Sequence, residues 1–136
     1  MNQKLNCILV IDDDEPTNFI HKKILQLSGL VDNVHVTQGG QEALEYLGNN
    51  GNHDQGTALP DIIFLDINMP AMDGWEFLVQ YEKLKHLNKE NIVIVMLTTS
   101  LNPDDEIKAK GIKEVFGYRN KPLTKQLIQE IADKKF

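Results

Sequence analysis

Short apolar runs and longer amphipathic stretches follow one another along this chain. The runs are continuous and only a few residues long, which is typical of strands buried on both faces of a parallel sheet. Five such segments predict strands at 5–11, 33–37, 61–65, 92–97 and 114–118.

The stretches between the runs carry apolar residues three and four positions apart, as amphipathic helices do. Helices are predicted from Pro16 to Gly29, over 41–48, from the cap Asp73 to Leu84, from Asn102 to Gly111 and over 123–135. In the first helix the apolar residues at helical spacing are Ile20, Ile24 and Leu27.

Residues 49–60 are rich in Asn, Gly and Asp and predict a loop, either a surface insertion or a functional lid. Five β-α units in succession favour an α/β fold, with helices on both faces of a doubly wound parallel sheet. No internal repeat or interdomain linker is evident, so we expect one domain over 1–136 without an output domain.

Composition narrows the function. The formal net charge of −6 is opposite to the basic footprint that nucleic-acid binding needs, so we expect no direct DNA or RNA partner. No apolar run approaches the roughly 20 residues of a membrane span, so we expect no membrane insertion. The single cysteine, Cys7, lies in an apolar run and is interpreted as a buried side chain of a cytoplasmic protein, with a reactive thiol as the alternative.

Polar residues follow four of the predicted strands. Asp12 and Asp13 follow the first, Asp66 the third, Thr98 the fourth and Lys121 the fifth. Ligands of open α/β sheets bind at the carboxyl ends of the strands, so we expect these side chains to converge on one pocket.

The convergent residue types suit a metal ion and a phosphoryl group. Clustered carboxylates repel one another unless a hard cation such as Mg²⁺ lies among them. Asp66 could then act as a nucleophile, while Lys121 and Thr98 contact phosphoryl oxygens. The four histidines are scattered and are predicted to be solvated or in loops: His21, His35, His53 and His86.

Each residue taken alone has a structural alternative. Asp14 is predicted to cap the first helix, and Asp12 and Asp13 could form a solvated turn. Thr98 alone could be structural, and Lys121 before a proline is weak support by itself. Their joint placement at neighbouring strand ends favours the functional interpretation.

The motifs at these strand ends resemble the response-regulator receiver family. The matching segments are ILVIDDDEP at 8–16, DIIFLDINMPAMDGWEFL at 61–78, VMLTTS at 95–100 and GYRNKPL at 117–123. The resemblance implies a flavodoxin-like, CheY-like fold with strand order 2-1-3-4-5. It also implies a two-component response regulator that switches partner binding, not a turnover enzyme.

The resemblance also implies residue roles. Asp66 would accept the phosphoryl group, and Thr98 and Lys121 would contact it. Asp12, Asp13, Asp66 and the backbone carbonyl of Asn68 would hold Mg²⁺. Thr98 and Tyr118 would be the switch residues. The Lys121–Pro122 bond is commonly cis in the family.

The resemblance also implies partners. The phosphoryl donor would be a sensor histidine kinase or a histidine phosphotransfer protein. An unidentified downstream protein would bind the face formed by the fourth helix, fifth strand and fifth helix, about 102–135. Two alternatives stay open: a magnesium-dependent phosphohydrolase, which position 68 disfavours because it is Asn rather than an acid, and an interaction module that is not phosphorylated.

Overall fold

The computed structural model describes residues 4–52, 59–84 and 91–135. These residues form five parallel strands in the order β2-β1-β3-β4-β5, as the sequence predicts. The elements are β1 (Leu5–Ile11), α1 (Glu15–Ser28), β2 (Val31–Thr37), α2 (Gly40–Asn52), β3 (Ile62–Asp66), α3 (Gly74–Glu82), β4 (Val93–Thr98), α4 (Pro103–Lys110), β5 (Val115–Asn120) and α5 (Lys125–Lys135).

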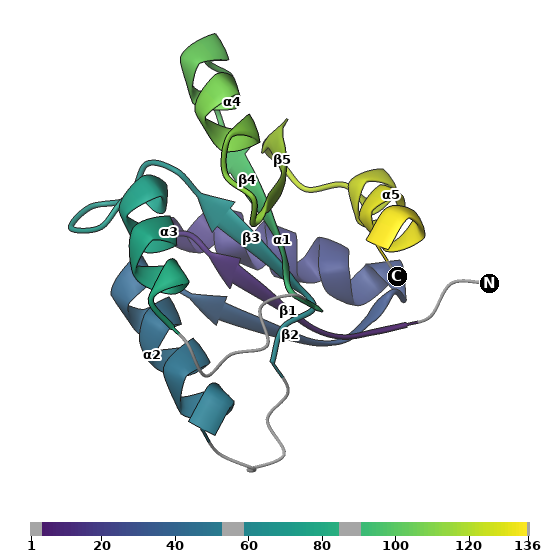
Figure 1. The fold of residues 1–136 in the computed structure, drawn as a ribbon. Coiled ribbons are helices and arrows are strands. Elements are labelled where there is room, and N and C mark those ends of the chain that lie inside the picture. Colours follow the sequence, from purple (N-terminus) through teal and green to yellow (C-terminus); the bar gives the residue numbers. More distant parts are fainter. Residues whose placement is uncertain (1–3, 53–58, 85–90, 136) are drawn as a thin grey trace.

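Alternate side chains of the central strands enter two separate hydrophobic layers. In β3, Ile63 and Leu65 pack with side chains of α2, α3 and α4, whereas Ile62 and Phe64 pack with side chains of α1 and α5. Helices therefore cover both faces of the sheet (Figure 1). This arrangement explains why the central strands are apolar throughout, because both of their faces are buried.

Local sequence signals define several helix ends. The Asp14 carboxylate accepts a hydrogen bond from the Thr17 amide and caps α1, and Gly29 ends that helix with a φ of 73°. Asp73 and Glu76 form the predicted capping box of α3. These caps satisfy backbone groups that have no partner inside the helix, which is why the sequence predicts them well.

Several predicted boundaries were wrong by a few residues. Helix α2 continues to Asn52, inside the predicted loop 49–60, of which 53–58 lie outside the described residues. Strand β2 begins two residues earlier than predicted, at Val31, and α5 begins at Lys125 instead of residue 123. Strands β3 and β4 extend one residue further, so that Asp66 and Thr98 are their last residues.

The predicted apolar face of α1 was wrong at Ile20 and Leu27, whereas Ile24 is partly buried and packs against the core. Ile20 is 50% exposed and Leu27 is 82% exposed. The helix instead buries a stripe in which polar and apolar residues are mixed: Asn18, His21, Leu25 and Ser28. The expectation of solvated or loop histidines fails for His21 and also for His35, which lies in β2 and stacks on the Tyr46 ring, whereas His53 and His86 lie outside the described residues.

Candidate functional site

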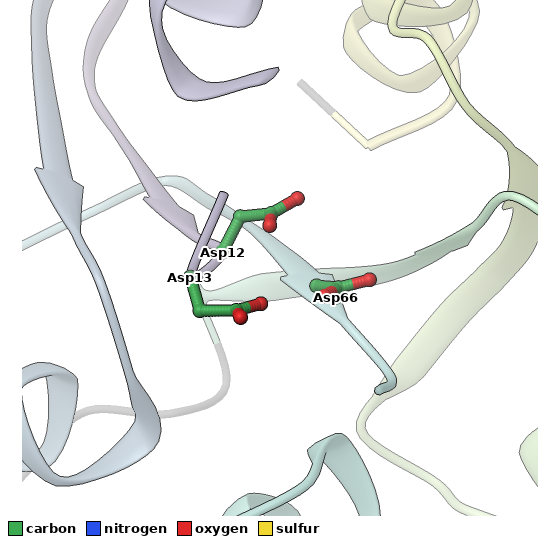
Figure 2. A group of neighbouring side chains, drawn as sticks. All are labelled: Asp12, Asp13 and Asp66. Carbon is green, nitrogen blue, oxygen red and sulfur yellow. The ribbon is translucent and has the colours of Figure 1, made fainter. Parts of the chain in front are cut away.

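Three carboxylates meet at the ends of β1 and β3. Asp12, Asp13 and Asp66 each offer an oxygen, and these oxygens all lie within 4.8 Å of one another. Figure 2 shows the three carboxyl groups side by side at the strand ends. Asp12 and Asp66 are buried and Asp13 is exposed, so the cluster is reached from solvent on the Asp13 side.

Lys121 completes the cluster from the segment after β5. Its ammonium Nζ lies 2.6 Å from Asp12 Oδ2 and 2.8 Å from Asp66 Oδ1. Burial alone lowers the pKa of Lys121, but its hydrogen bonds to Asp12 and Asp66 outweigh that effect and raise the pKa above its ordinary value. The lysine therefore stays charged and neutralises part of the negative charge of the carboxylate cluster.

The Asp66 carboxylate lies in an environment that disfavours its charged form. Desolvation raises the pKa of Asp66, and the negative charges of Asp12 and Asp13 raise it further, while the hydrogen bond from Lys121 opposes them. The net pKa is higher than that of an ordinary aspartate. A cation at this position would favour the ionised form that a nucleophile needs.

The donor set fits a hard divalent cation. It consists of carboxylate oxygens, without nitrogen or sulfur ligands, and one exposed side leaves room for retained water. Mg²⁺ is usually held in this way, by a small number of carboxylates together with water.

Thr98 and Lys121 are joined through the backbone. The Lys121 amide donates to the Thr98 carbonyl at 2.8 Å. The Thr98 hydroxyl donates to the Ser100 carbonyl at 3.2 Å and accepts from the Ser100 amide at 3.1 Å. The hydroxyl therefore lies at the same end of the sheet but is hydrogen-bonded to its own loop.

Tyr118 and Asn68 occupy different environments. Tyr118 is buried, and its hydroxyl accepts a hydrogen bond from the Asn102 amide, directly before α4. Asn68 is exposed and lies two residues after Asp66.

The Lys121–Pro122 peptide bond is cis. The predicted burial of Cys7 is confirmed.

Sequence comparison identifies the family. The sequence model of the response regulator receiver domain matches residues 8–133. The chain belongs to the response regulator receiver family. Receiver domains are switches of two-component signalling that are phosphorylated on aspartate, generally bind Mg²⁺ in an acidic pocket, and interact with histidine kinases or phosphotransfer proteins.

Relatives of the receiver domain come from distant organisms. The probable methanogenesis regulatory protein FilR2 of Methanothrix harundinacea is 28% identical over 130 residues, which are 93% of this chain and 81% of that protein. The response regulator Rcp1 of Synechocystis sp. is 27% identical over 121 residues, which are 80% of each chain.

Solved structures support the same assignment. A two-component response regulator from Cytophaga hutchinsonii is 30% identical, has a TM-score of 0.89 and covers 97% of each chain. The Mn²⁺-bound form of response regulator Rcp1 is 27% identical with a TM-score of 0.70, covering 92% of this chain and 90% of that one.

Two site-adjacent residues were missed by the sequence analysis. Asn18 and His21 are buried on α1 and hydrogen-bond to backbone atoms near the cluster. Their spacing of three residues on a helix was the available signal, but it predicts a shared face without predicting its direction. No described helix is both long and apolar enough to cross a bilayer.

Proposed function

We propose that this protein is a signalling switch whose phosphate acceptor is Asp66. The observation that carries the proposal is the placement of Asp66 beside Asp12, Asp13 and Lys121 at the strand ends. A sensor histidine kinase or histidine phosphotransfer protein presents a phosphohistidine, and the Asp66 carboxylate attacks its phosphorus as the P–N bond breaks. The product is an aspartyl phosphate on this protein and a free histidine on the donor.

Asp12, Asp13, Asp66 and the Asn68 carbonyl would hold Mg²⁺, which when bound neutralises charge on the phosphoryl oxygens. The Mn²⁺-bound form of the related Rcp1 supports a divalent site. Lys121 is already within hydrogen-bond distance of Asp66, so its ammonium can follow the negative charge from the carboxylate to the phosphoryl group. The Thr98 hydroxyl would exchange its bonds with Ser100 for one to a phosphoryl oxygen.

The same proposal assigns the output surface to α4, β5 and α5, residues 102–135. A movement of Thr98 would shift Tyr118, because β4 pairs with β5. Tyr118 in turn contacts α4, because its hydroxyl accepts a hydrogen bond from the Asn102 amide directly before that helix. Of the α4 side chains only Ala109 is buried, so this helix can shift without disrupting much of the core. We place this switch in the cytoplasm, where its single, unpaired cysteine would stay reduced.

Intact-mass spectrometry after incubation with acetyl phosphate and Mg²⁺ tests the acceptor. The wild type is expected to gain one phosphoryl group, Asp66→Asn to gain none, and Asp133→Asn, which removes an exposed charge on α5, to behave as the wild type. A wild type without mass gain, or an equal gain in Asp66→Asn, would overturn the proposal. Turnover of many acetyl phosphate molecules per protein, faster than a switch requires, would favour a phosphohydrolase instead.

A further inference from the structure

Helix α1 directs two buried polar side chains, Asn18 and His21, towards the backbone of the candidate site. Asn18 is 5% exposed and His21 is 1% exposed. They lie three residues apart and therefore on one face of the helix. We call them the α1 polar pair.

Asn18 contacts the acidic side of the site. Its side-chain Nδ2 donates to the backbone carbonyl of Asp12 at 2.7 Å, and this bond is buried. The Asp12 amide donates to the Thr37 carbonyl at 3.2 Å. The Asp12 backbone is therefore held between helix α1 and strand β2, which limits the directions its carboxylate can take.

His21 contacts the basic side of the site. Its Nε2 accepts a hydrogen bond from the Leu123 amide at 3.2 Å. Leu123 follows Lys121 by two residues, and the Lys121 amide is bonded to the Thr98 carbonyl. The segment that carries the ammonium is thus fixed at one end by β4 and at the other by His21.

Burial of the α1 polar pair lowers the stability of the fold. Because Nε2 of His21 accepts, the ring proton lies on Nδ1, and within the described part of the chain neither His21 Nδ1 nor Asn18 Oδ1 has a hydrogen-bond partner. Buried polar atoms without partners destabilise a fold, and apolar side chains of similar size would avoid that penalty. The hydrogen bonds of the α1 polar pair to the Asp12 carbonyl and the Leu123 amide offer a physical reason for its presence.

We propose that Asn18 and His21 are positioning residues that set the two halves of the site from one helix face. Asn18 orients the acidic half through Asp12, and His21 orients the ammonium of Lys121 through Leu123. Only the experiment that measures phosphoryl transfer depends on the proposed function; the labelling and Mg²⁺ experiments do not. Neither residue touches the reacting atoms; each acts through backbone bonds.

Chemical labelling of lysine amines tests the His21 half without phosphorylation. Lys121 is held between two carboxylates and should react slowly, whereas Lys110 on α4 has a side chain that is 76% exposed and serves as the internal reference. In His21→Leu the Leu123 amide loses its acceptor, and the Lys121 labelling rate relative to Lys110 is expected to rise about fivefold, the equivalent of one hydrogen bond. In His21→Gln, whose Oε1 can accept at a similar reach, the rate should stay near that of the wild type.

A matched control separates positioning from general destabilisation. Ser28 is also buried on α1, and its Oγ accepts from the Leu30 amide, but it contacts neither half of the site. Ser28→Ala should loosen α1 without changing Lys121 labelling. If His21→Leu does not fold, His21→Asn carries the same expectation because its Oδ1 ends short of the position of Nε2.

The two halves should separate in their effects on metal and phosphate. Mg²⁺ affinity can be followed by the fluorescence of Trp75, the one tryptophan of the chain. Asn18→Ala is expected to weaken Mg²⁺ affinity about fivefold, whereas His21→Leu should leave it within about twofold and slow acetyl phosphate transfer at saturating Mg²⁺ about fivefold.

The outcomes are distinguishable. Equal Lys121 labelling in the wild type and His21→Leu, or an equal rise in Ser28→Ala, overturns the His21 assignment. Parallel losses of Mg²⁺ affinity and transfer rate in Asn18→Ala and His21→Leu overturn the division into two halves. If the wild type takes up no phosphoryl group but the labelling and Mg²⁺ differences are seen, the positioning inference stands and the proposed function falls.

Discussion

Lys121 balances the charge of two buried carboxylates, and this balance dominates the energetics of the site at the residue scale. Its Nζ is within 2.8 Å of both Asp12 and Asp66. Removal of one member of such a buried group leaves an uncompensated charge, which is strongly destabilising. In the proposed function the same ammonium would pair with phosphoryl oxygens, so one side chain would both balance the carboxylates and bind the incoming anion.

His21 should make the protein less stable in acid. Burial lowers the pKa of His21, with the charge of Asp12 opposing and that of Lys121 adding to the effect. Below about pH 6.5, the ordinary histidine value, the unfolded chain takes up a proton that folded His21 resists. The free energy of unfolding therefore falls as the pH falls through this range, by at most about 1.4 kcal/mol per pH unit for this one group.

His21→Gln removes that titration and keeps an acceptor for the Leu123 amide. Urea unfolding at several pH values between 7 and 5 should show a shallower loss of stability in the variant than in the wild type. The difference between the two slopes isolates His21, because the other histidines are common to both proteins. Identical slopes would show that His21 does not resist protonation in the fold.

The chemistry of single residues was predictable where position alone decides it. Asp12 and Asp66 directly follow apolar runs and Lys121 follows the fifth predicted strand, so their convergence follows from the parallel sheet. The α1 polar pair was missed because apolar residues at Ile20 and Leu27 have a clearer helical spacing. These two residues lie one position before the buried residues His21 and Ser28. A histidine suits the buried face of α1 because it accepts a hydrogen bond from the Leu123 amide. That amide is 102 positions away in the sequence, so its position is known only from the fold.

At the scale of elements, local chemistry fixes helix starts, and tertiary pairing fixes strand ends. Asp14, Asp73 and Asn102 cap their helices through bonds that span only two or three residues. Strand ends depend instead on the neighbouring strand: Asp66 pairs with Leu97 and Thr98 with Asn120. A single sequence does not contain that register, which explains why both strands extend one residue beyond their predicted ends.

The connection from β3 to α3 requires a glycine at Gly74, where α3 begins. A Cβ at Gly74 would lie 2.8 Å from the Asp66 carbonyl oxygen and 3.0 Å from Ile67 Cα, both of which are backbone atoms. For the same atom added at Gly48, inside α2, the described residues place nothing within 4 Å apart from its chain neighbours and the backbone of its own helix. Identical substitutions should therefore have opposite effects.

Gly74→Ala is expected to destabilise the protein by about 1–3 kcal/mol, because backbone must shift to relieve the overlap. Gly48→Ala should stabilise it by about 0.5–1 kcal/mol, because alanine loses less conformational freedom in a helix. Urea unfolding of both variants measures the two values. Effects of the same sign would show that the close approach of α3 to the end of β3 does not decide which residue is tolerated at position 74.

At the scale of the whole molecule, the strand order brings residues from opposite ends of the chain together. Asp12 and Lys121 are 109 positions apart in the sequence; Asp12 follows β1 and Lys121 follows the edge strand β5, with β3 and β4 between these two strands in the sheet. The cluster of carboxylates and Lys121 therefore exists only in the folded chain, and in the unfolded chain these side chains are scattered. A ligand that binds this cluster must consequently favour the folded state.

Mg²⁺ is therefore expected to raise the free energy of unfolding by about 2.7 kcal/mol when its free concentration is one hundred times its Kd. Asp13→Asn should lose most of this gain, because it removes a carboxylate of the cluster. Because Asp13 is exposed, the same substitution should change stability little in the absence of Mg²⁺.

Asp133→Asn changes the net charge equally at a distance from the site and should keep the whole gain. Thermal unfolding of the three proteins, with K⁺ at matched ionic strength as a control for screening, measures the effect. Equal stabilisation of all three by Mg²⁺ would mean that the ion acts on the general negative charge of the surface, and the acidic cluster would then have no special affinity for it.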